Sequence, residues 1–422
     1  MTSQNRRLTM KDNQAKYPQL RFKGFTDPWE KRTLGQTTTK AKSYSLSRDV
    51  ERDYETGYRY IHYGDIHTGV ADIVTEHTKL PNIEPANYDE LRVNDLVVAD
   101  ASEDYQGIAE PAVVVGLPTH LVAGLHTITL RPSSASSLYL YYLLHTDSFK
   151  HFGYQMGTGL KVFGISWSNL SKFTFMIPSR PEQEMIVKLI ESVDNLIAVN
   201  QRKLAKLKEL KQGYLQKMFP QNGSKFPQLR FAGFADAWEQ RNWKDVVEIS
   251  TNMVDPKTGS FDDLPHIGPG NIESFTGRLL DNVKSVKEEH LISGKFHFNE
   301  GDVIYGKINP QLGKYIRANF EGLASADSYV INAKKNLVQN FLYIILQTQN
   351  FYKYSVSVSK RTGMPKINRD ELNNYTFLAP GVAEQRHIGS LFENLDHLIT
   401  LHQRKLDLLK EQKKGFLQKM FC

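Results

Sequence analysis

The sequence of 422 residues contains a single cysteine, Cys422, which is its last residue. One thiol can form no disulfide within the chain and no cysteine zinc cluster, which is typical of a protein from a reducing compartment. No run of eighteen apolar residues occurs, and residues 1–16 carry basic residues but no apolar segment. These absences argue against a membrane-spanning helix and a secretory signal. We therefore expect a cytoplasmic protein.

Motifs of the common catalytic and nucleotide-binding sites are also lacking. The sequence has no G-x-G-x-x-G fingerprint, no G-x-S-x-G elbow and no Asn/Asp-Pro-Pro-aromatic stretch of amino-methyltransferases. Residues 301–308 resemble a phosphate-binding loop, but Ile308 replaces the hydroxyl residue that binds Mg²⁺. His62 and His67 form no zinc-protease pattern and are better explained as structural histidines. We expect no catalytic residue and no metal site, and the net charge of +7 suits a polyanionic partner.

The sequence contains an internal repeat in two parts. Residues 16–32, KYPQLRFKGFTDPWEKR, recur 209 residues later as KFPQLRFAGFADAWEQR, with 12 of 17 positions identical. Residues 182–219 recur at an offset of 202 as residues 384–421, with 22 of 38 identities. We call the first pair of segments the arms. The chain is therefore organised as arm, domain, helix, arm, domain, helix, and the two divergent domains are expected to share one fold.

Both copies of the second repeat have the heptad pattern of a coiled coil. Apolar residues alternate at spacings of four and three along residues 186–218 and again along residues 388–420. Asn200 and His402 interrupt the two seams midway and would fix their register at a cost in stability. Ser179 and Glu182 have the spacing of an N-terminal capping box before the first helix.

A helix of 38 residues spans about 57 Å and needs a partner. A homodimeric coiled coil is one possibility, but two matching helices in one chain favour pairing with each other at high effective concentration. The connection Pro220–Ser224 is short, so the second helix cannot begin beside the start of the first without a long bridge. The sequence therefore predicts antiparallel pairing, with each domain at the start of its own helix and a pseudo-two-fold relation between the halves.

Short β-like runs and one longer amphipathic segment recur in each domain. Strands are expected at residues 58–63, 95–99, 112–115, 127–130 and 173–177, and at 302–305, 328–332 and 375–378. Helices are expected at residues 137–152 and 339–354. The predicted fold class is mixed α/β, with two similar globular domains separated by two long antiparallel coiled-coil helices. The predicted boundaries are a flexible tail 1–16, then 17–181, 182–220, 221–383 and 384–422.

The arms PQLRFxGFxxxWE, the paired helices ending in QKMF and the two unlike domains resemble the specificity subunit of a type I restriction-modification system. The resemblance covers residues 17–421. It implies two target-recognition domains, each reading one half of an asymmetric bipartite sequence in double-stranded DNA, with the helices setting the spacer. It also implies a non-catalytic subunit that docks two methyltransferase subunits and the restriction or motor subunits. S-adenosylmethionine, ATP and Mg are then expected on those partners, with no cofactor bound by this chain.

Two segments look like the recognition loops of that family, residues 100–105 and residues 307–314. In the second, lysines could neutralise phosphates or reach guanine, and an asparagine could pair with adenine. Glycine-containing loops at residues 157–164 and 360–367 could approach the DNA backbone closely. The candidate DNA-binding residues are Asp100, Ser102, Tyr105, Lys161, Lys307, Asn309, Lys314, Arg361 and Lys366.

Two other classes of protein fit parts of the sequence. A non-catalytic adaptor could use the two domains to bind proteins and the coiled coil as a scaffold. Salt-sensitive, sequence-selective DNA binding would separate that adaptor from a specificity subunit. A fusion enzyme of methyltransferase and nuclease would carry the corresponding motifs, which the sequence lacks.

Overall fold

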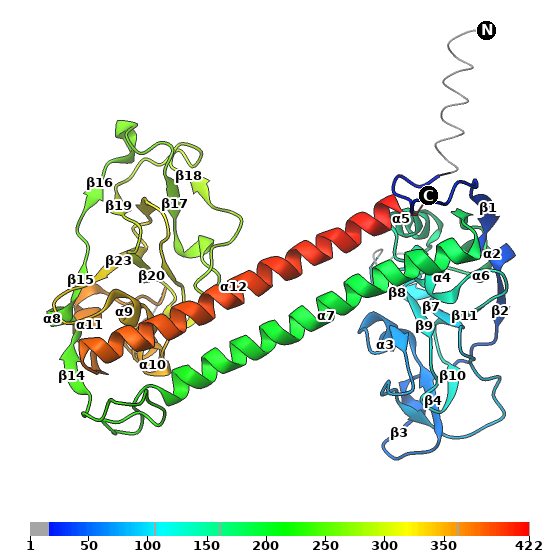
Figure 1. Cartoon of the computed structure of the whole chain (residues 1–422), viewed down its shortest axis with the longest axis horizontal. Helices are drawn as coiled ribbons and strands as arrows, with labels where there is room; N and C mark the ends of the chain where they lie inside the picture. Colours follow the sequence, from blue (N-terminus) through cyan, green and yellow to red (C-terminus); the bar gives the residue numbers. More distant parts are fainter. Residues whose placement is uncertain (1–16, 105–106, 160–161, 361–362, 422) are drawn as a thin grey trace, which may run out of the picture. The chain divides into compact units, whose positions relative to one another are not determined.

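The computed structural model describes residues 17–104, 107–159, 162–360 and 363–421. These fall into two compact units. The first contains the chain up to Asn200 together with the segment from Lys405 onward, and the second is Gln201–Arg404. Each unit therefore holds one domain and a part of each long helix (Figure 1). The predicted tail, residues 1–16, lies outside the described residues.

The first domain is built on two sheets. A five-stranded sheet has the order β2-β11-β7-β9-β5, and the strand β7, all of whose side chains are buried, lies at its centre. Its strands are β2 (Thr38–Ala41), β11 (Thr127–Pro132), β7 (Leu96–Ala99), β9 (Pro111–Val114) and β5 (Ile73–Val74). A four-stranded sheet has the order β10-β4-β6-β3, with strands β10 (His120–Ala123), β4 (Tyr58–Ile61), β6 (Asn82–Ile83) and β3 (Glu51–Arg52).

Smaller pairs and short helices complete the first domain. The pair β1 (Glu30–Thr33) and β13 (Thr174–Ile177) joins the arm to the segment before the long helix, and β8 (Ala101–Ser102) pairs with β12 (Phe163–Gly164). The short helices are α2 (Leu34–Thr37), η1 (Arg48–Val50), α3 (Tyr63–His67), α4 (Ser137–Leu143), α5 (Asp147–Met156) and α6 (Trp167–Leu170).

The second domain repeats this plan. Its four-stranded sheet β15-β23-β20-β21 and its five-stranded sheet β16-β19-β22-β17-β18 are accompanied by the pair β14-β24. The strands are β14 (Glu239–Asn242), β15 (Val247–Ile249), β16 (Met253–Val254), β17 (Pro265–Ile267), β18 (Lys284–Ser285), β19 (Lys295–Phe298), β20 (Val303–Gly306), β21 (Tyr315–Arg317), β22 (Gly322–Ala324), β23 (Ser328–Ala333) and β24 (Thr376–Ala379). The helices are α8 (Trp243–Val246), η2 (Pro256–Thr258), η3 (Pro269–Asn271), η4 (Pro310–Leu312), α9 (Gln339–Ile345), α10 (Gln349–Val358) and α11 (Arg369–Asn373).

The predicted strands are present within one or two residues, but the predicted helices 137–152 and 339–354 are each broken in two. The hydroxyl of Thr146 donates to the Leu143 carbonyl at 2.7 Å, ending α4, and accepts from the Phe149 amide at 3.3 Å, starting α5. Thr348 makes the same two bonds between α9 and α10. The prediction of single helices was therefore wrong because a threonine cap can end one helix and begin the next.

The long helices α7 (Arg180–Lys217) and α12 (Val382–Lys419) pair antiparallel, as predicted. In the first unit Lys413 Nζ lies 2.6 Å from Asp194 Oδ1, and in the second Lys211 Nζ lies 2.6 Å from Asp396 Oδ1. The offset of 202 residues relates the two ion pairs, so each unit has the same helix register. The heptad residues along both seams are buried or half-buried, which confirms the coiled-coil pattern.

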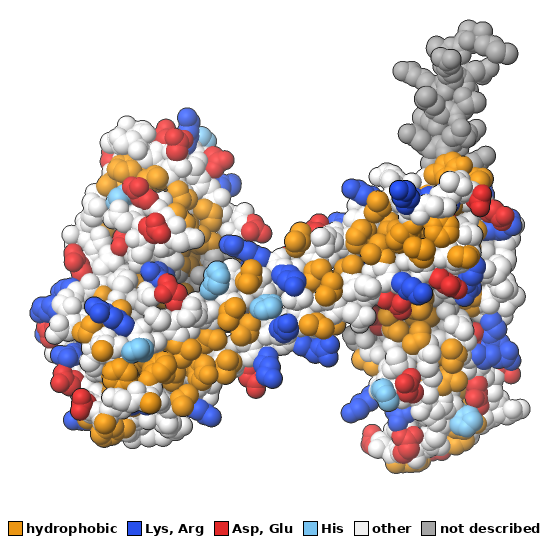
Figure 2. Space-filling view, viewed as in Figure 1, with side chains coloured by type: hydrophobic (Ala, Val, Ile, Leu, Met, Phe, Trp, Pro, Cys, Tyr) orange, Lys and Arg blue, Asp and Glu red, His pale blue; other side chains and the backbone are white. Residues whose placement is uncertain are grey.

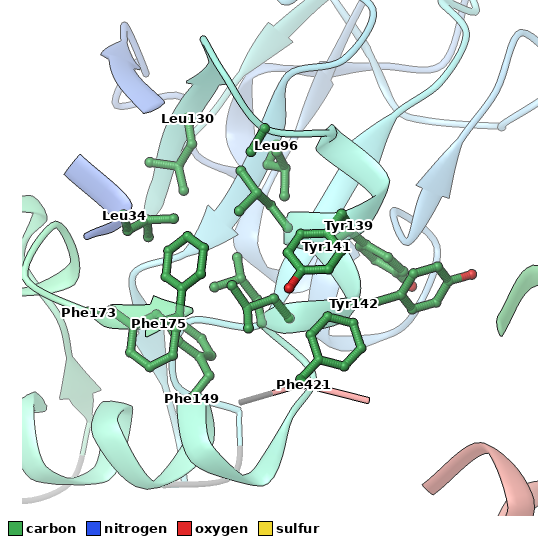
Figure 3. Close-up of a cluster of buried hydrophobic side chains, with 14 of the residues drawn as sticks. Leu34, Leu96, Leu130, Tyr139, Tyr141, Tyr142, Phe149, Phe173, Phe175 and Phe421 are labelled. Atoms are coloured by element: carbon green, nitrogen blue, oxygen red, sulfur yellow. The ribbon is translucent and has the colours of Figure 1, made fainter. Parts of the chain in front are cut away.

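The end of α12 packs into the hydrophobic core of the first domain, and the end of α7 packs into the core of the second domain. Met420 and Phe421, after α12, belong to the core of the first unit, where the Phe421 ring stacks on Tyr139 at 5.0 Å (Figure 3). Met218 and Phe219, after α7, belong to the core of the second unit, where Phe219 stacks on Phe341 at 5.6 Å. The repeated ending QKMF therefore completes a core at both places.

Candidate nucleic-acid interface

The arms are held at the starts of the long helices by buried ion pairs. The Arg21 guanidinium donates to both carboxylate oxygens of Glu182, at 2.7 and 2.8 Å, and the Trp29 indole donates to Glu182 Oε2 at 3.2 Å. In the second unit Arg230 donates to both oxygens of Glu384, each at 2.8 Å. Glu182, which the sequence assigned to a capping box, therefore has long-range partners that a local motif does not reveal.

Each arm also contacts the end of the other long helix. The Leu20 amide donates to the Lys419 carbonyl at 2.8 Å, and the Leu229 amide donates to the Lys217 carbonyl at 2.8 Å. Carbonyls in the last turn of a helix have no partner within the helix, so these bonds cap α12 and α7. Each arm thus joins the beginning of one long helix to the end of the other, within one unit. This junction explains much of the sequence identity between the copies.

The candidate loops of the second domain lie side by side. The Ile367 amide donates to the Lys307 carbonyl at 3.0 Å, the Asn309 amide donates to the Pro365 carbonyl at 2.7 Å, and Ile308 forms a β-bridge with Lys366. Asn309 has a left-handed conformation, with φ 49°. Three of the predicted residues, Lys307, Asn309 and Lys366, are therefore brought together by backbone pairing.

The side chains of these loops differ in what they can offer to a ligand. Lys366 is exposed, and the Lys307 ammonium lies 5.5 Å from the centre of the Tyr329 ring. The Lys314 ammonium donates to the Ile272 carbonyl, so it links this loop to the turn after β17. Lys314 is thus a cross-link within the domain, a role that its loop position did not predict.

Phe275, on the segment that follows this turn, is a residue that sequence reasoning missed. It has a left-handed backbone with φ 63°, and its side chain is exposed. Its amide donates to the Gly313 carbonyl at 2.9 Å, and its carbonyl accepts from the Tyr315 hydroxyl at 3.1 Å. A Cβ on Gly313, which has φ 54°, would lie 2.4 Å from the Phe275 ring, so a side chain there would displace this ring. No local pattern marks a non-glycine residue for this conformation.

The first domain pairs its candidate loops in the same way. The Ile165 amide donates to the Asp100 carbonyl at 2.9 Å, and β8 pairs with β12 so that Ser102 lies opposite Phe163. Asp100 Oδ1 lies 3.2 Å from His126 Nδ1, whereas Ser102 is buried and accepts from the Asp104 amide at 3.2 Å. Ile165 and Ile367 are 202 residues apart, so the two domains present equivalent loop pairs.

Three of the predicted residues, Tyr105, Lys161 and Arg361, lie outside the described residues. The predicted register residues lie within the helices. Asn200 is buried in α7 and donates through Nδ2 to the Leu196 carbonyl at 2.7 Å, while His402 is half-buried in α12.

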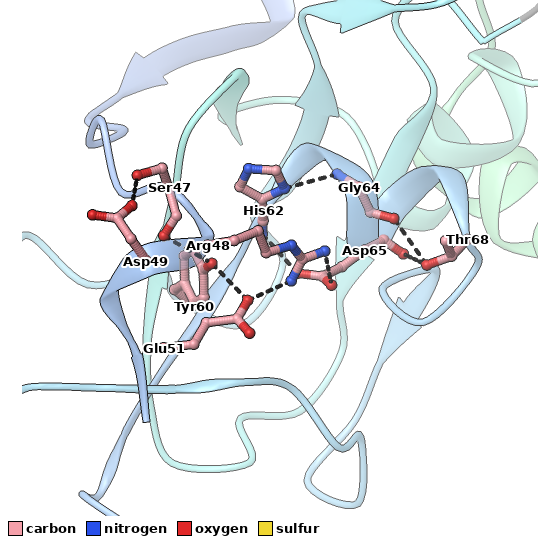
Figure 4. A network of polar contacts seen from close by, with 9 residues as sticks. All are labelled: Ser47, Arg48, Asp49, Glu51, Tyr60, His62, Gly64, Asp65 and Thr68. Carbon is pink, nitrogen blue, oxygen red and sulfur yellow. Dashed lines mark hydrogen bonds and ion pairs between the residues drawn. The ribbon is translucent and has the colours of Figure 1, made fainter. Parts of the chain in front are cut away.

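The helix α3 lies beside the first pair of loops and is fixed by charge. Asp65 Oδ2 accepts from the His62 amide at 2.9 Å, and Oδ1 accepts from Arg48 at 2.8 Å (Figure 4). Arg48 also donates to Glu51 at 2.6 Å, and His62 Nδ1 accepts from the Gly64 amide at 3.1 Å. Burial lowers the pKa of His62. His62 and His67 both have hydrogen-bond partners, in agreement with their prediction as structural residues.

Apolar side chains remain exposed at equivalent places in the two halves. In the arms these are Tyr17 and Leu20, matched by Phe226 and Leu229. On the long helices they are Leu196 and Val199, matched by Leu398 and Leu401. Figure 2 shows hydrophobic side chains between lysine and arginine side chains on the exposed face of these helices. The exposed apolar positions of the two halves therefore match residue by residue.

Comparison with known proteins gives consistent matches. A family model described as the type I restriction modification DNA specificity domain matches twice, over residues 26–209 and 235–411. The chain is 27% identical over 297 residues to the EcoDI specificity subunit of a type I restriction enzyme from Escherichia coli. That match covers 64% of this chain and 65% of the relative, just under two thirds of its length. A second relative, the MjaVIII specificity subunit from Methanocaldococcus jannaschii, is 20% identical over 93% of this chain and 91% of its own length.

Solved structures share the fold. The S subunit of the type I restriction-modification system from M. genitalium aligns with a TM-score of 0.63 and 13% identity, over 96% of this chain and 99% of that one. A chain solved for complex assembly and conformational transition of the type I R-M system aligns with a TM-score of 0.51 and 16% identity, over 93% and 97%. In the part of the chain that the structure describes, no helix is long and apolar enough to span a membrane.

Proposed function

Because the chain belongs to the type I restriction-modification DNA specificity family, its role is DNA recognition, and we propose that each of its two domains reads one half of a bipartite asymmetric site. The observation that carries this proposal is the equivalence of the loop pairs. Residues 100–102 with 163–165 and residues 307–309 with 365–367 have the same backbone pairing but unlike side chains. The same backbone arrangement with different side chains in each domain would recognise two different half-sites.

The long helices would set the distance between the half-sites. The Asp194–Lys413 pair in the first unit and the Lys211–Asp396 pair in the second hold the same helix register, and a shift of either helix would break both pairs. Each helix of 38 residues is about 57 Å long, which corresponds to roughly 17 base pairs at 3.4 Å each. The unspecified spacer of the DNA site would then follow from helix length.

The duplicated apolar residues of the arms and helices would dock two identical methyltransferase subunits. The equivalent positions of Leu196 with Val199 and Leu398 with Leu401 support this, because identical partners need equivalent surfaces. Methylation of adenine with S-adenosylmethionine, and cleavage with ATP and Mg, would belong to methyltransferase and motor subunits of a cytoplasmic complex. This chain would contribute recognition and no catalytic group.

The test is to co-express the chain with a cognate methyltransferase subunit and to map methylated adenines across the genome by single-molecule sequencing. A bipartite asymmetric motif with a fixed gap is the expected result. A stable complex that produces no methylation, or one continuous palindrome, would contradict the two-reader proposal. DNA binding that is neither salt-sensitive nor sequence-selective would favour a protein-binding adaptor.

A further inference from the structure

His67, at the end of α3 in the first domain, lies between two hydrogen-bond acceptors. Its Nε2 lies 2.8 Å from the Ala101 carbonyl oxygen, and its Nδ1 lies 3.0 Å from Glu110 Oε2. A carbonyl oxygen and an ionised carboxylate only accept hydrogen bonds, whereas a neutral imidazole carries a single N–H. Both contacts are therefore satisfied only by the doubly protonated ring.

We propose that His67, as an imidazolium, is a positioning residue that holds the recognition loop of the first domain in its DNA-reading conformation. The inference rests on the proposed function, since it takes residues 100–104 to be part of a DNA-reading loop. It adds a residue outside the predicted DNA-contacting set, which acts through the loop and not on the DNA itself.

His67 contacts two separate segments of the first domain. Ala101 begins β8 in the loop, and Glu110 directly precedes β9. Gly107 packs so closely that an added Cβ would lie 3.1 Å from the imidazole and 2.5 Å from Ser102 Oγ. The imidazole of His67 therefore forms hydrogen bonds that join both β8 and the segment before β9 to the helix α3.

The helix α3, which carries His67, is itself held by hydrogen bonds and an ion pair, so the position of the imidazole is fixed. Asp65, two residues earlier, is bound by Arg48 and by the His62 amide, as Figure 4 shows. The Tyr63 ring makes a near-perpendicular contact with the imidazole, with ring centres 5.8 Å apart. The contacts of His67 therefore tie Ala101 and Glu110 to a helix that is itself held in place.

The second domain makes the corresponding link with a different cation. There the Lys314 ammonium, on the loop, donates to the carbonyl of Ile272, in the turn after β17. Ile272 corresponds to Ile66, the residue before His67, when Gly270-Asn271-Ile272 is aligned with Gly64-Asp65-Ile66. Both domains therefore join the same turn to the same loop through a basic side chain, which is a histidine in the first domain and a lysine in the second.

The charged groups around His67 favour its protonated form. The hydrogen bond to Glu110 is the main cause that raises the pKa of His67, and the Ala101 carbonyl and the Asp104 carboxylate act in the same direction. Partial burial opposes them. Of the other nearby acids, Asp65 is paired with Arg48 and Asp100 with His126. The link is therefore intact below the raised pKa and weakens as the pH rises through it.

The experiment uses the full chain in complex with its methyltransferase partner and DNA duplexes that carry the mapped site. Single-base changes are placed in one half-site at a time, and binding is measured by fluorescence anisotropy at pH 6.0 and pH 8.5. For the wild type, discrimination at the half read by the first domain should fall on the order of tenfold at the higher pH, the loss of one charge-assisted hydrogen bond. Discrimination at the other half should stay constant.

Two variants separate the imidazolium from other groups that titrate. His67→Lys keeps a permanent charge and should retain high discrimination at both pH values, whereas His67→Gln should show low discrimination at both. The half-site read by the second domain reports whether each variant is folded. A pH effect that persists in His67→Lys, or wild-type discrimination in His67→Gln, would overturn the proposal. Failure of the proposed function is a separate result, because the wild type would then discriminate at neither half-site.

Discussion

Arg21 and Glu182 are 161 residues apart in the sequence, yet the guanidinium of one contacts both carboxylate oxygens of the other. Arg230 and Glu384 repeat the contact in the second unit. One difference separates the copies. The Trp29 indole also donates to Glu182, whereas the Trp238 indole nitrogen is buried with no partner among the described residues. The two carboxylates therefore depend to different degrees on their arginines.

Arg230→Ala should destabilise the second unit by about 3 kcal/mol, because it leaves the buried Glu384 carboxylate without its only ion-pair partner among the described residues. Arg21→Ala should cost the first unit less, since Glu182 keeps the Trp29 bond. Urea unfolding curves give both free energies. Arg32→Ala is the matched control, because its pair with Glu30 is exposed and is worth less than about 1 kcal/mol. Equal losses for all three variants would mean that burial of the pair is unimportant.

Replacing Lys366 with alanine should weaken DNA binding at the second half-site and lower the salt slope by about one unit. Its side chain is exposed beside the paired loops and is available to a phosphate. Anisotropy titrations at several salt concentrations give the slope. Lys257→Ala, an exposed lysine in η2 outside these loops, serves as the control. An unchanged slope in Lys366→Ala would remove this residue from the interface.

Lys307→Ala and Lys314→Ala should both reduce methylation through the second half-site and leave the identity of the first unchanged. The causes differ. Lys307 offers a charge beside Tyr329, whereas Lys314 ties its loop to Ile272. Lys314→Ala should therefore also relax base discrimination at that half. Sequencing of the modified sites reads both effects, and full efficiency with full specificity would exclude a role for either lysine.

Removing one heptad from each long helix, residues 199–205 and 401–407, should shorten the spacer. Seven residues correspond to about 10 Å, or roughly three base pairs, and a deletion of seven keeps the heptad phase. A deletion in one helix alone should instead separate Lys211 from Asp396 or Lys413 from Asp194 and reduce stability. The methylation map of each variant gives the spacer. If the double-deletion variant forms an active complex that keeps the original spacer, helix length does not set the spacer.

The second unit should lose stability on mild acidification through His266. Burial lowers the pKa of this histidine, although the contact of its Nδ1 with Glu289 at 2.7 Å partly opposes the effect. A depressed histidine pKa stabilises the fold above the unfolded value of about 6.5, and this contribution disappears as the pH falls below it. His266→Gln should therefore show a smaller drop in unfolding temperature between pH 7 and pH 5 than the wild type. His397→Gln, at an exposed position of α12, should follow the wild type.

The sequence was most informative where neighbouring residues determine the structure. The apolar run Leu96–Ala99 became a buried central strand, and the heptads of residues 186–218 became a paired helix. Prediction from the sequence failed where a short side chain or a partner distant in the sequence determines the structure. The apolar periodicity predicts one helix that continues through Thr146, but the hydroxyl of this threonine ends α4 there. Glu182 binds an arginine in the arm, which no local motif indicates. The link between His67 and Glu110 spans 43 residues and has no spacing that a motif could encode.

The contacts of Leu20 with Lys419 and of Leu229 with Lys217 have a topological consequence. Lys217 and Leu229 are close in the sequence, whereas Leu20 and Lys419 lie near its opposite ends. The amide nitrogen and the carbonyl oxygen are nevertheless 2.8 Å apart in both contacts. The end of a long helix thus meets an arm in each unit, and the polypeptide itself connects that helix and arm only in the second unit. A circular permutant that joins residue 421 to residue 17 through a copy of PQNGS, and opens within residues 221–224, should fold to the same units and recognise the same DNA.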